Sequence, residues 1–131
     1  MGEYKGGAVF DGHGGWQISD YLHRNIAEVA NEAYKKNSMN ANKKDAISNT
    51  LIDTFDTLEG NIVQALYEAY DMGFGNLNSV GSCGVVALAS KEFYAIGNAG
   101  DCQAILVYED DNGNFRGVNL AQVYSANLIS E

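Results

Sequence analysis

Lysine and arginine are scarce in this chain, and their scarcity excludes several kinds of partner. The 131 residues carry 8 lysines and arginines against 17 aspartates and glutamates, which gives a net charge of −9. Nucleic acids and anionic membranes are bound largely through clustered Lys and Arg side chains. We therefore expect no nucleic-acid partner and no membrane partner.

Cysteine and long apolar runs are also scarce, and proline is absent. Cys83 and Cys102 fit no zinc-binding pattern, and neither is followed by an arginine six positions on, which excludes a cysteine-nucleophile phosphatase loop. Both lie in apolar runs, so we expect free buried thiols, with a disulfide as the alternative. No apolar run reaches the ~20 residues of a membrane helix and no signal peptide is seen, so we expect an intracellular, cytoplasmic protein.

The motifs of several enzyme classes are missing as well. The sequence has neither a Walker loop nor G-x-G-x-x-G, the usual phosphate-cradling patterns. It also lacks the G-x-S-x-G turn that carries the nucleophilic serine of many hydrolases.

Hydrophobic periodicity indicates an α+β fold. Apolar residues recur at three- and four-residue steps over residues 16–36 and 43–71, which predicts two amphipathic helices, with Gly60 as a point where the second could bend. Short apolar segments predict strands at residues 8–10, 83–89, 93–97, 104–108 and about 116–123. Because consecutive strands are joined by short turns, we expect an antiparallel sheet with both helices packed on one face.

Two glycine loops concentrate acidic residues. DGHGG occupies residues 11–15 after the first predicted strand, and GNAGD occupies residues 97–101 between two later strands. Taken singly, each loop is typical of a turn, and His23 on the first helix is typical of a surface histidine.

Three motifs in order give the chain a resemblance to a known family. AVFDGHGG, then GSCGVVAL, then YAIGNAGDCQAIL resemble the N-terminal part of the metal-dependent protein serine/threonine phosphatases of type 2C. The matching positions are residues 9–15, Gly81 and Ser82 with residues 85–88, and Asn98, Gly100, Asp101, Cys102 and Ala104. The resemblance implies an antiparallel β-sandwich flanked by α-helices, of which this chain looks like a partial unit.

The resemblance also implies an activity, a cofactor and a site. The activity is hydrolysis of phosphoserine and phosphothreonine on a phosphoprotein substrate, with two Mg²⁺ or Mn²⁺ ions. Asp11 matches the carboxylate that bridges the two ions, and the backbone carbonyl of Gly12 matches a ligand of one of them. His13 matches the proposed general acid, and Asp101 matches an acid associated with a further metal. Carboxylate and carbonyl oxygens suit these ions, and two ions about 3.5–4 Å apart require a bridging anion.

The sequence also departs from the family pattern. The seven residues before Ala8 contain neither the arginine nor the aspartate that the family carries there. Gln103 stands in place of the usual arginine, Cys83 and Gly84 replace Thr-Ala, and Ala126 and Asn127 replace Asp-His. We therefore expect residues 1–131 to form a single, incomplete domain that is inactive alone; the alternative is a phosphatase-like module that has lost catalysis and binds a partner protein.

An incomplete sandwich would leave one sheet face uncovered. We expect this chain to associate with itself, or with the missing half of the domain, through the sheet face that contains Val85, Ile96 and Leu106 or their immediate neighbours.

Overall fold

The computed structural model describes residues 4–39 and 41–122, and within them two long helices precede most of the strands. In chain order the elements are β1 (Lys5–His13), α1 (Gln17–Ser38), α2 (Lys43–Asp71), a 3₁₀ helix η1 (Gly75–Ser79), β2 (Gly81–Ala89), β3 (Tyr94–Ala99), β4 (Ile105–Glu109) and β5 (Phe115–Asn119). The α+β class predicted from the sequence is confirmed. No helix in the described part of the chain is long and apolar enough to cross a membrane.

The two helices follow the predicted apolar periodicity closely. α1 runs two residues further than predicted, to Ser38, and its last turn carries Lys35 and Lys36, which complement the helix dipole. Asn42 precedes α2, and its side chain caps the helix by accepting a hydrogen bond of 2.9 Å from the Asp45 backbone N–H. Gly60 neither ends nor interrupts α2, which is one helix from Lys43 to Asp71.

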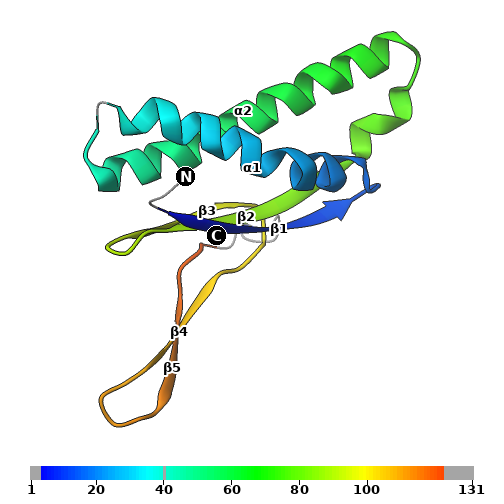
Figure 1. Cartoon of the computed structure of the whole chain (residues 1–131). Helices are drawn as coiled ribbons and strands as arrows, with labels where there is room; N and C mark the ends of the chain where they lie inside the picture. The colour runs from blue at the N-terminus through cyan, green and yellow to red at the C-terminus, as the bar shows by residue number, and fades with distance from the viewer. Residues whose placement is uncertain (1–3, 40, 123–131) are drawn as a thin grey trace, which may run out of the picture.

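The main sheet has three antiparallel strands in the order β1-β2-β3. β1 pairs with β2 along its whole length, from Lys5 opposite Ala89 to His13 opposite Gly81. This strand is longer than the predicted residues 8–10, because the glycines on either side of that segment also pair with β2. Figure 1 shows α1 and α2 lying over one face of this sheet.

The hydrophobic core lies between the helices and that sheet face. Its buried members come from the chain start, the first half of α2 and the middle of β2: Tyr4, Ile47, Leu51, Val86 and Leu88. Every buried residue of α2 lies between Ala46 and Leu58, so the second half of the helix is not part of the core.

β4 and β5 form a separate two-stranded hairpin, which extends from the opposite side of the main sheet (Figure 1). All residues of both strands are exposed. The expectation of one uncovered face through Val85, Ile96 and Leu106 needs correction, because Val85 is buried and Leu106 belongs to the hairpin instead of the main sheet. Val85 is buried within the chain at 7% exposure, whereas Leu106 on the hairpin is 39% exposed.

Candidate functional site

The first glycine loop is held tightly at the end of β1. Phe10 packs against the core, and a Cβ at Gly12 would lie 2.6 Å from Ser19 Oγ of α1, so both residues face the helices. Side chains alternate along a strand, which directs Asp11 to the opposite face of the sheet. Gly14 has a φ of 70°, and a side chain there would collide with the carbonyl oxygen of Ser79. Glycine at this position therefore allows the turn into α1 to pack closely against the start of β2.

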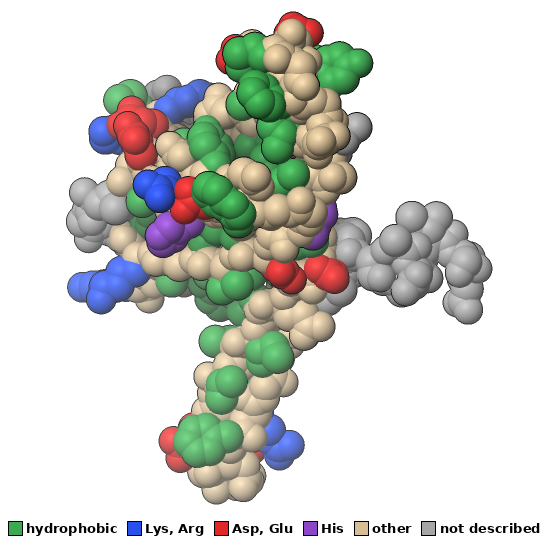
Figure 2. All heavy atoms as spheres, turned by 90° about the vertical axis from the view of Figure 1, so that its right-hand side faces the viewer, with side chains coloured by type: hydrophobic (Ala, Val, Ile, Leu, Met, Phe, Trp, Pro, Cys, Tyr) green, Lys and Arg blue, Asp and Glu red, His purple; other side chains and the backbone are tan. Residues whose placement is uncertain are grey.

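The second glycine loop lies at the same end of the sheet. β1 and β3 are both antiparallel to β2, so they run in the same direction and both end beside the start of β2. Asp11 ends up opposite Cys83, and Asp101 follows two residues after the end of β3. Figure 2 looks towards this end and shows acidic side chains exposed between the helices and the hairpin. The structure therefore brings the two loops together.

Cys102 links the two loops. The Asp11 backbone N–H lies near its thiol and lowers the pKa of that thiol, the smallest of the effects on it. Burial raises the pKa of the Cys102 thiol, and the charges of Cys83, Asp101 and Asp11 raise this pKa further. Both carboxylates are thus close enough to act on the same sulfur atom, which stays protonated at neutral pH. Both cysteines are free thiols, as expected from the sequence, although each is only half-buried.

Gly100 allows the GNAGD loop to pack closely against Cys83. Its φ of 93° is a left-handed conformation that favours glycine, and a side chain there would collide with the sulfur of Cys83. The sequence had identified Asp101 but gave no role to either cysteine. Cys83 could have been assigned to this site only by knowing that it pairs with Asp11, and this pairing depends on the strand register.

His13 lines a cleft that neither carboxylate enters. Its exposed ring stands against Gly81 on the paired strand, where a Cβ would lie 2.8 Å from the ring Cε1 atom. The ring lines a cleft of about 280 Å³ between the sheet and the helices, together with mainly apolar side chains such as Phe10, Leu22 and Phe55. Neither Asp11 nor Asp101 lines this cleft, so the three predicted side chains do not converge on one pocket.

The residues present do not fit a complete two-metal centre. Mg²⁺ requires six ligands in near-octahedral geometry, with several places taken by water. Within the described ranges no three His, Cys, Asp or Glu side chains are grouped so that they could hold a metal ion. The loops offer two carboxylates, Asp11 and Asp101, and the Gly12 carbonyl. These donors are too few for two such ions.

Comparison with known proteins agrees with the order of the motifs. The profile of the family "Protein phosphatase 2C" matches residues 4–127. The chain belongs to the protein phosphatase 2C family. Among curated proteins, it is 32% identical over 111 residues to "Protein phosphatase 2C 16" of Arabidopsis thaliana, an alignment that covers 75% of this chain and 22% of that relative. The chain thus spans about a fifth of the length of that relative.

Membership of the protein phosphatase 2C family accounts for the architecture described above. The family comprises protein serine/threonine phosphatases that are in general metal-dependent and act on phosphoproteins. The helical pair and the antiparallel strands of this chain are consistent with part of that fold.

Proposed function

We propose that residues 1–131 form one incomplete domain that supplies the N-terminal part of a protein serine/threonine phosphatase. The observation that carries the proposal is that the DGHGG and GNAGD loops meet at one end of the main sheet. The carboxylates of Asp11 and Asp101 both raise the pKa of Cys102 there. In the complete domain, Asp11, the Gly12 carbonyl and Asp101 serve as ligands for Mg²⁺ or Mn²⁺. The remaining ligands come from polypeptide outside this chain.

His13 is proposed as the general acid. It follows the loop acid by two residues, and among the described residues no hydrogen bond ties up its ring, so the ring is free to meet a substrate. A general acid protonates the departing alcohol oxygen, and such assistance contributes typically 10²–10⁴-fold to the rate. The contribution is large for the poor leaving group of phosphothreonine and small for a good one such as p-nitrophenolate.

That difference between leaving groups tests the proposal. In the full-length native protein with Mn²⁺, His13→Gln should lower kcat on a phosphothreonine peptide by about 10²-fold. The same variant should lose much less activity on p-nitrophenyl phosphate. His23→Gln, at an exposed position on α1, is the matched control and should retain activity on both substrates. Equal losses on the two substrates would contradict a general-acid role for His13.

The second candidate function is a catalytically inactive interaction module. Gln103, where the family usually carries an arginine, and the incomplete donor set favour it. This reading expects a full-length protein that turns over neither substrate at any Mg²⁺ or Mn²⁺ concentration, yet binds a partner protein. If the full-length protein turns over substrate and Asp11→Asn abolishes this turnover, the protein is an enzyme and the inactive-module hypothesis is rejected.

A further inference from the structure

An apolar groove lies where α2 ends and η1 begins, next to the cleft that His13 lines, and the two share Val63 and Leu66. It measures about 360 Å³, and its apolar lining consists of Val63, Leu66, Tyr67, Tyr70, Phe74 and Leu77. Three of these are large aromatic residues that are 60–67% exposed: Tyr67, Tyr70 and Phe74. In Figure 2 apolar side chains gather at the top of the view, with acidic side chains beside them.

The groove forms because α2 extends beyond the part of the molecule where it is buried. Its members on α2 recur at three- and four-residue steps, so they form one stripe along the helix. No residue of α2 beyond Leu58 is buried, because the core below the helix ends there. η1 then folds back against α2, and the backbone N–H of Phe74 donates to the carbonyl of Ala69 at 2.9 Å. The result is a pre-formed groove with an apolar floor.

Charge around the groove has one sign. On the part of α2 that borders the groove the charged residues are Glu59, Glu68 and Asp71, all acidic, and no lysine or arginine occurs between Lys44 and Lys91. Glu59 precedes Val63 by one helical turn and Asp71 follows Tyr67 by one turn, so the two acids border opposite ends of the stripe. Along the helix axis they are separated by roughly 18 Å.

The end of α2 adds to the negative potential. The C-terminus of a helix carries partial negative charge, which basic side chains in the last turn normally offset. The last turn of α2 contains no basic residue, and Asp71 ends it. A cation brought from outside would therefore be stabilised by both the carboxylate and the helix dipole.

A second copy of this chain is a poor occupant. It would place the same acidic residues opposite one another in a molecule with a net charge of −9, and like charges across an interface are unfavourable. We propose that the groove docks a basic amphipathic segment of a partner protein. This segment is a helix of about 12 residues with an apolar face and with Lys or Arg near both ends, matched to the spacing of Glu59 and Asp71.

A synthetic peptide tests the proposal. The probe is a fluorescein-labelled 14-residue helical peptide with Leu at i, i+3, i+4 and i+7 and Lys at the remaining positions, and binding to the full-length native protein is followed by fluorescence anisotropy. Tyr70→Ala and Phe74→Ala should each weaken binding about tenfold, as expected for aromatic residues that anchor an interface. Glu59→Gln and Asp71→Asn should each weaken it about threefold, and this effect should vanish in 0.5 M salt.

Matched controls come from the β4–β5 hairpin, which lies on the side of the main sheet opposite to α2 (Figure 1). Phe115→Ala removes an aromatic side chain that is 78% exposed, and Asp111→Asn removes an exposed charge; neither should change binding. A peptide with Glu in place of Lys should not bind. The proposal is overturned if the control variants weaken binding as much as the groove variants, or if the Glu peptide binds equally well. It is also overturned if the isolated 131-residue chain binds but the full-length protein does not, because the groove is then covered by its own polypeptide.

Discussion

At the level of single residues, a glycine can be required for two separate reasons: a left-handed backbone, or the lack of space for a side chain. Gly100 combines a φ of 93° with close contact to Cys83. Gly73 has a similar φ of 94°, but a side chain there would meet no atom within 4 Å. Gly60 has neither restriction and lies inside α2. The three positions therefore separate backbone strain from crowding.

Alanine at these three positions should give three different stabilities. Gly60→Ala should stabilise the fold by roughly 0.5–1 kcal/mol, because glycine costs that much in a helix interior. Gly73→Ala should destabilise by roughly 1–2 kcal/mol through the left-handed backbone alone. Gly100→Ala should lose more than Gly73→Ala, because it also displaces the Cys83 thiol. Urea unfolding measures all three free energies, and equal losses at Gly73 and Gly100 would show that the contact with Cys83 carries no cost.

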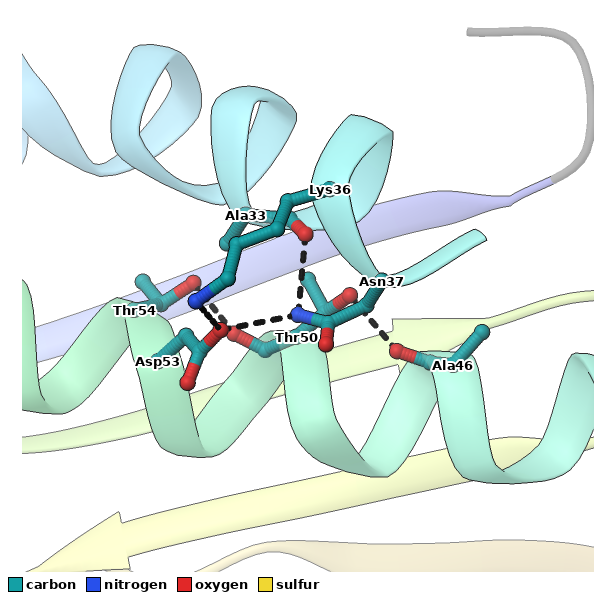
Figure 3. A network of polar contacts seen from close by, with 7 residues as sticks. All are labelled: Ala33, Lys36, Asn37, Ala46, Thr50, Asp53 and Thr54. Carbon is teal, nitrogen blue, oxygen red and sulfur yellow. Dashed lines mark hydrogen bonds and ion pairs between the residues drawn. The ribbon is translucent and has the colours of Figure 1, made fainter. Parts of the chain in front are cut away.

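At the level of elements, a polar network joins α1 to α2. The side chains of Lys36 and Asn37 on α1 each donate to Asp53 Oδ2 on α2 at 3.0 Å, and Asn37 also donates to the Ala33 carbonyl (Figure 3). Nearby, Thr50 and Thr54 are fully buried, and each hydroxyl donates to the carbonyl four residues earlier at 2.6 Å. The network fixes the relation between the two helices that cover the sheet.

This network should make stability depend on pH in the acidic range. The hydrogen bonds from Asn37 and then Lys36 lower the pKa of Asp53. A carboxyl whose pKa is lower in the folded chain stabilises the fold above its unfolded pKa of about 3.9, and that contribution disappears as pH falls through the folded value. Asp53→Asn should therefore cost roughly 1 kcal/mol at pH 7 and less at pH 3, where the unfolded carboxyl is already mostly protonated.

The matched control for this prediction is Asp56→Asn, one turn further along α2 at an exposed position. It should change the free energy of unfolding by less than about 0.5 kcal/mol at either pH. Urea unfolding at pH 7 and pH 3 distinguishes the two variants, and the same pH dependence in both would rule out a special role for Asp53.

The sequence predicted elements well where one periodicity ran over many residues. Both helices were placed within two residues at each end, because their apolar stripes are long. β1 was predicted too short, since Gly6, Gly7 and the DGHGG residues are typical of turns and only pairing with β2 makes them strand. The proximity of Cys102 to Asp11 could not be predicted either, because it depends on strand order and register.

At the level of the whole molecule, the donor shortage limits metal binding. Titration of the 131-residue chain with Mn²⁺ in a calorimeter should show no tight uptake of two ions, because two carboxylates and one carbonyl leave most coordination positions to water. Asp11→Asn should remove whatever weak binding remains. Tight binding of two ions per chain would mean that ligands beyond Asp11, Gly12 and Asp101 are present.

The exposed hairpin should make the isolated chain prone to associate. Large apolar side chains that are 39–78% exposed occupy both of its strands: Ile105, Leu106, Val107, Tyr108, Phe115 and Val118. Contiguous apolar patches beyond a few hundred Å² are rare on soluble monomers. Light scattering at low micromolar concentration should therefore show species larger than 14.1 kDa, together with binding of a hydrophobic dye. A stable monomer that binds no dye would contradict the incomplete-domain proposal.

The register of β1 has a consequence for the order of folding. α1 with α2, and β2 with β3, are neighbours in the sequence, so each pair can form as a local unit soon after its residues leave the ribosome. β1 has to wait, because its partner β2 lies beyond both helices, and closing so long a loop costs entropy before any contact is gained. Asp11 and His13 therefore take their places only when β1 docks on β2, so the candidate site forms after the helical pair and not together with it.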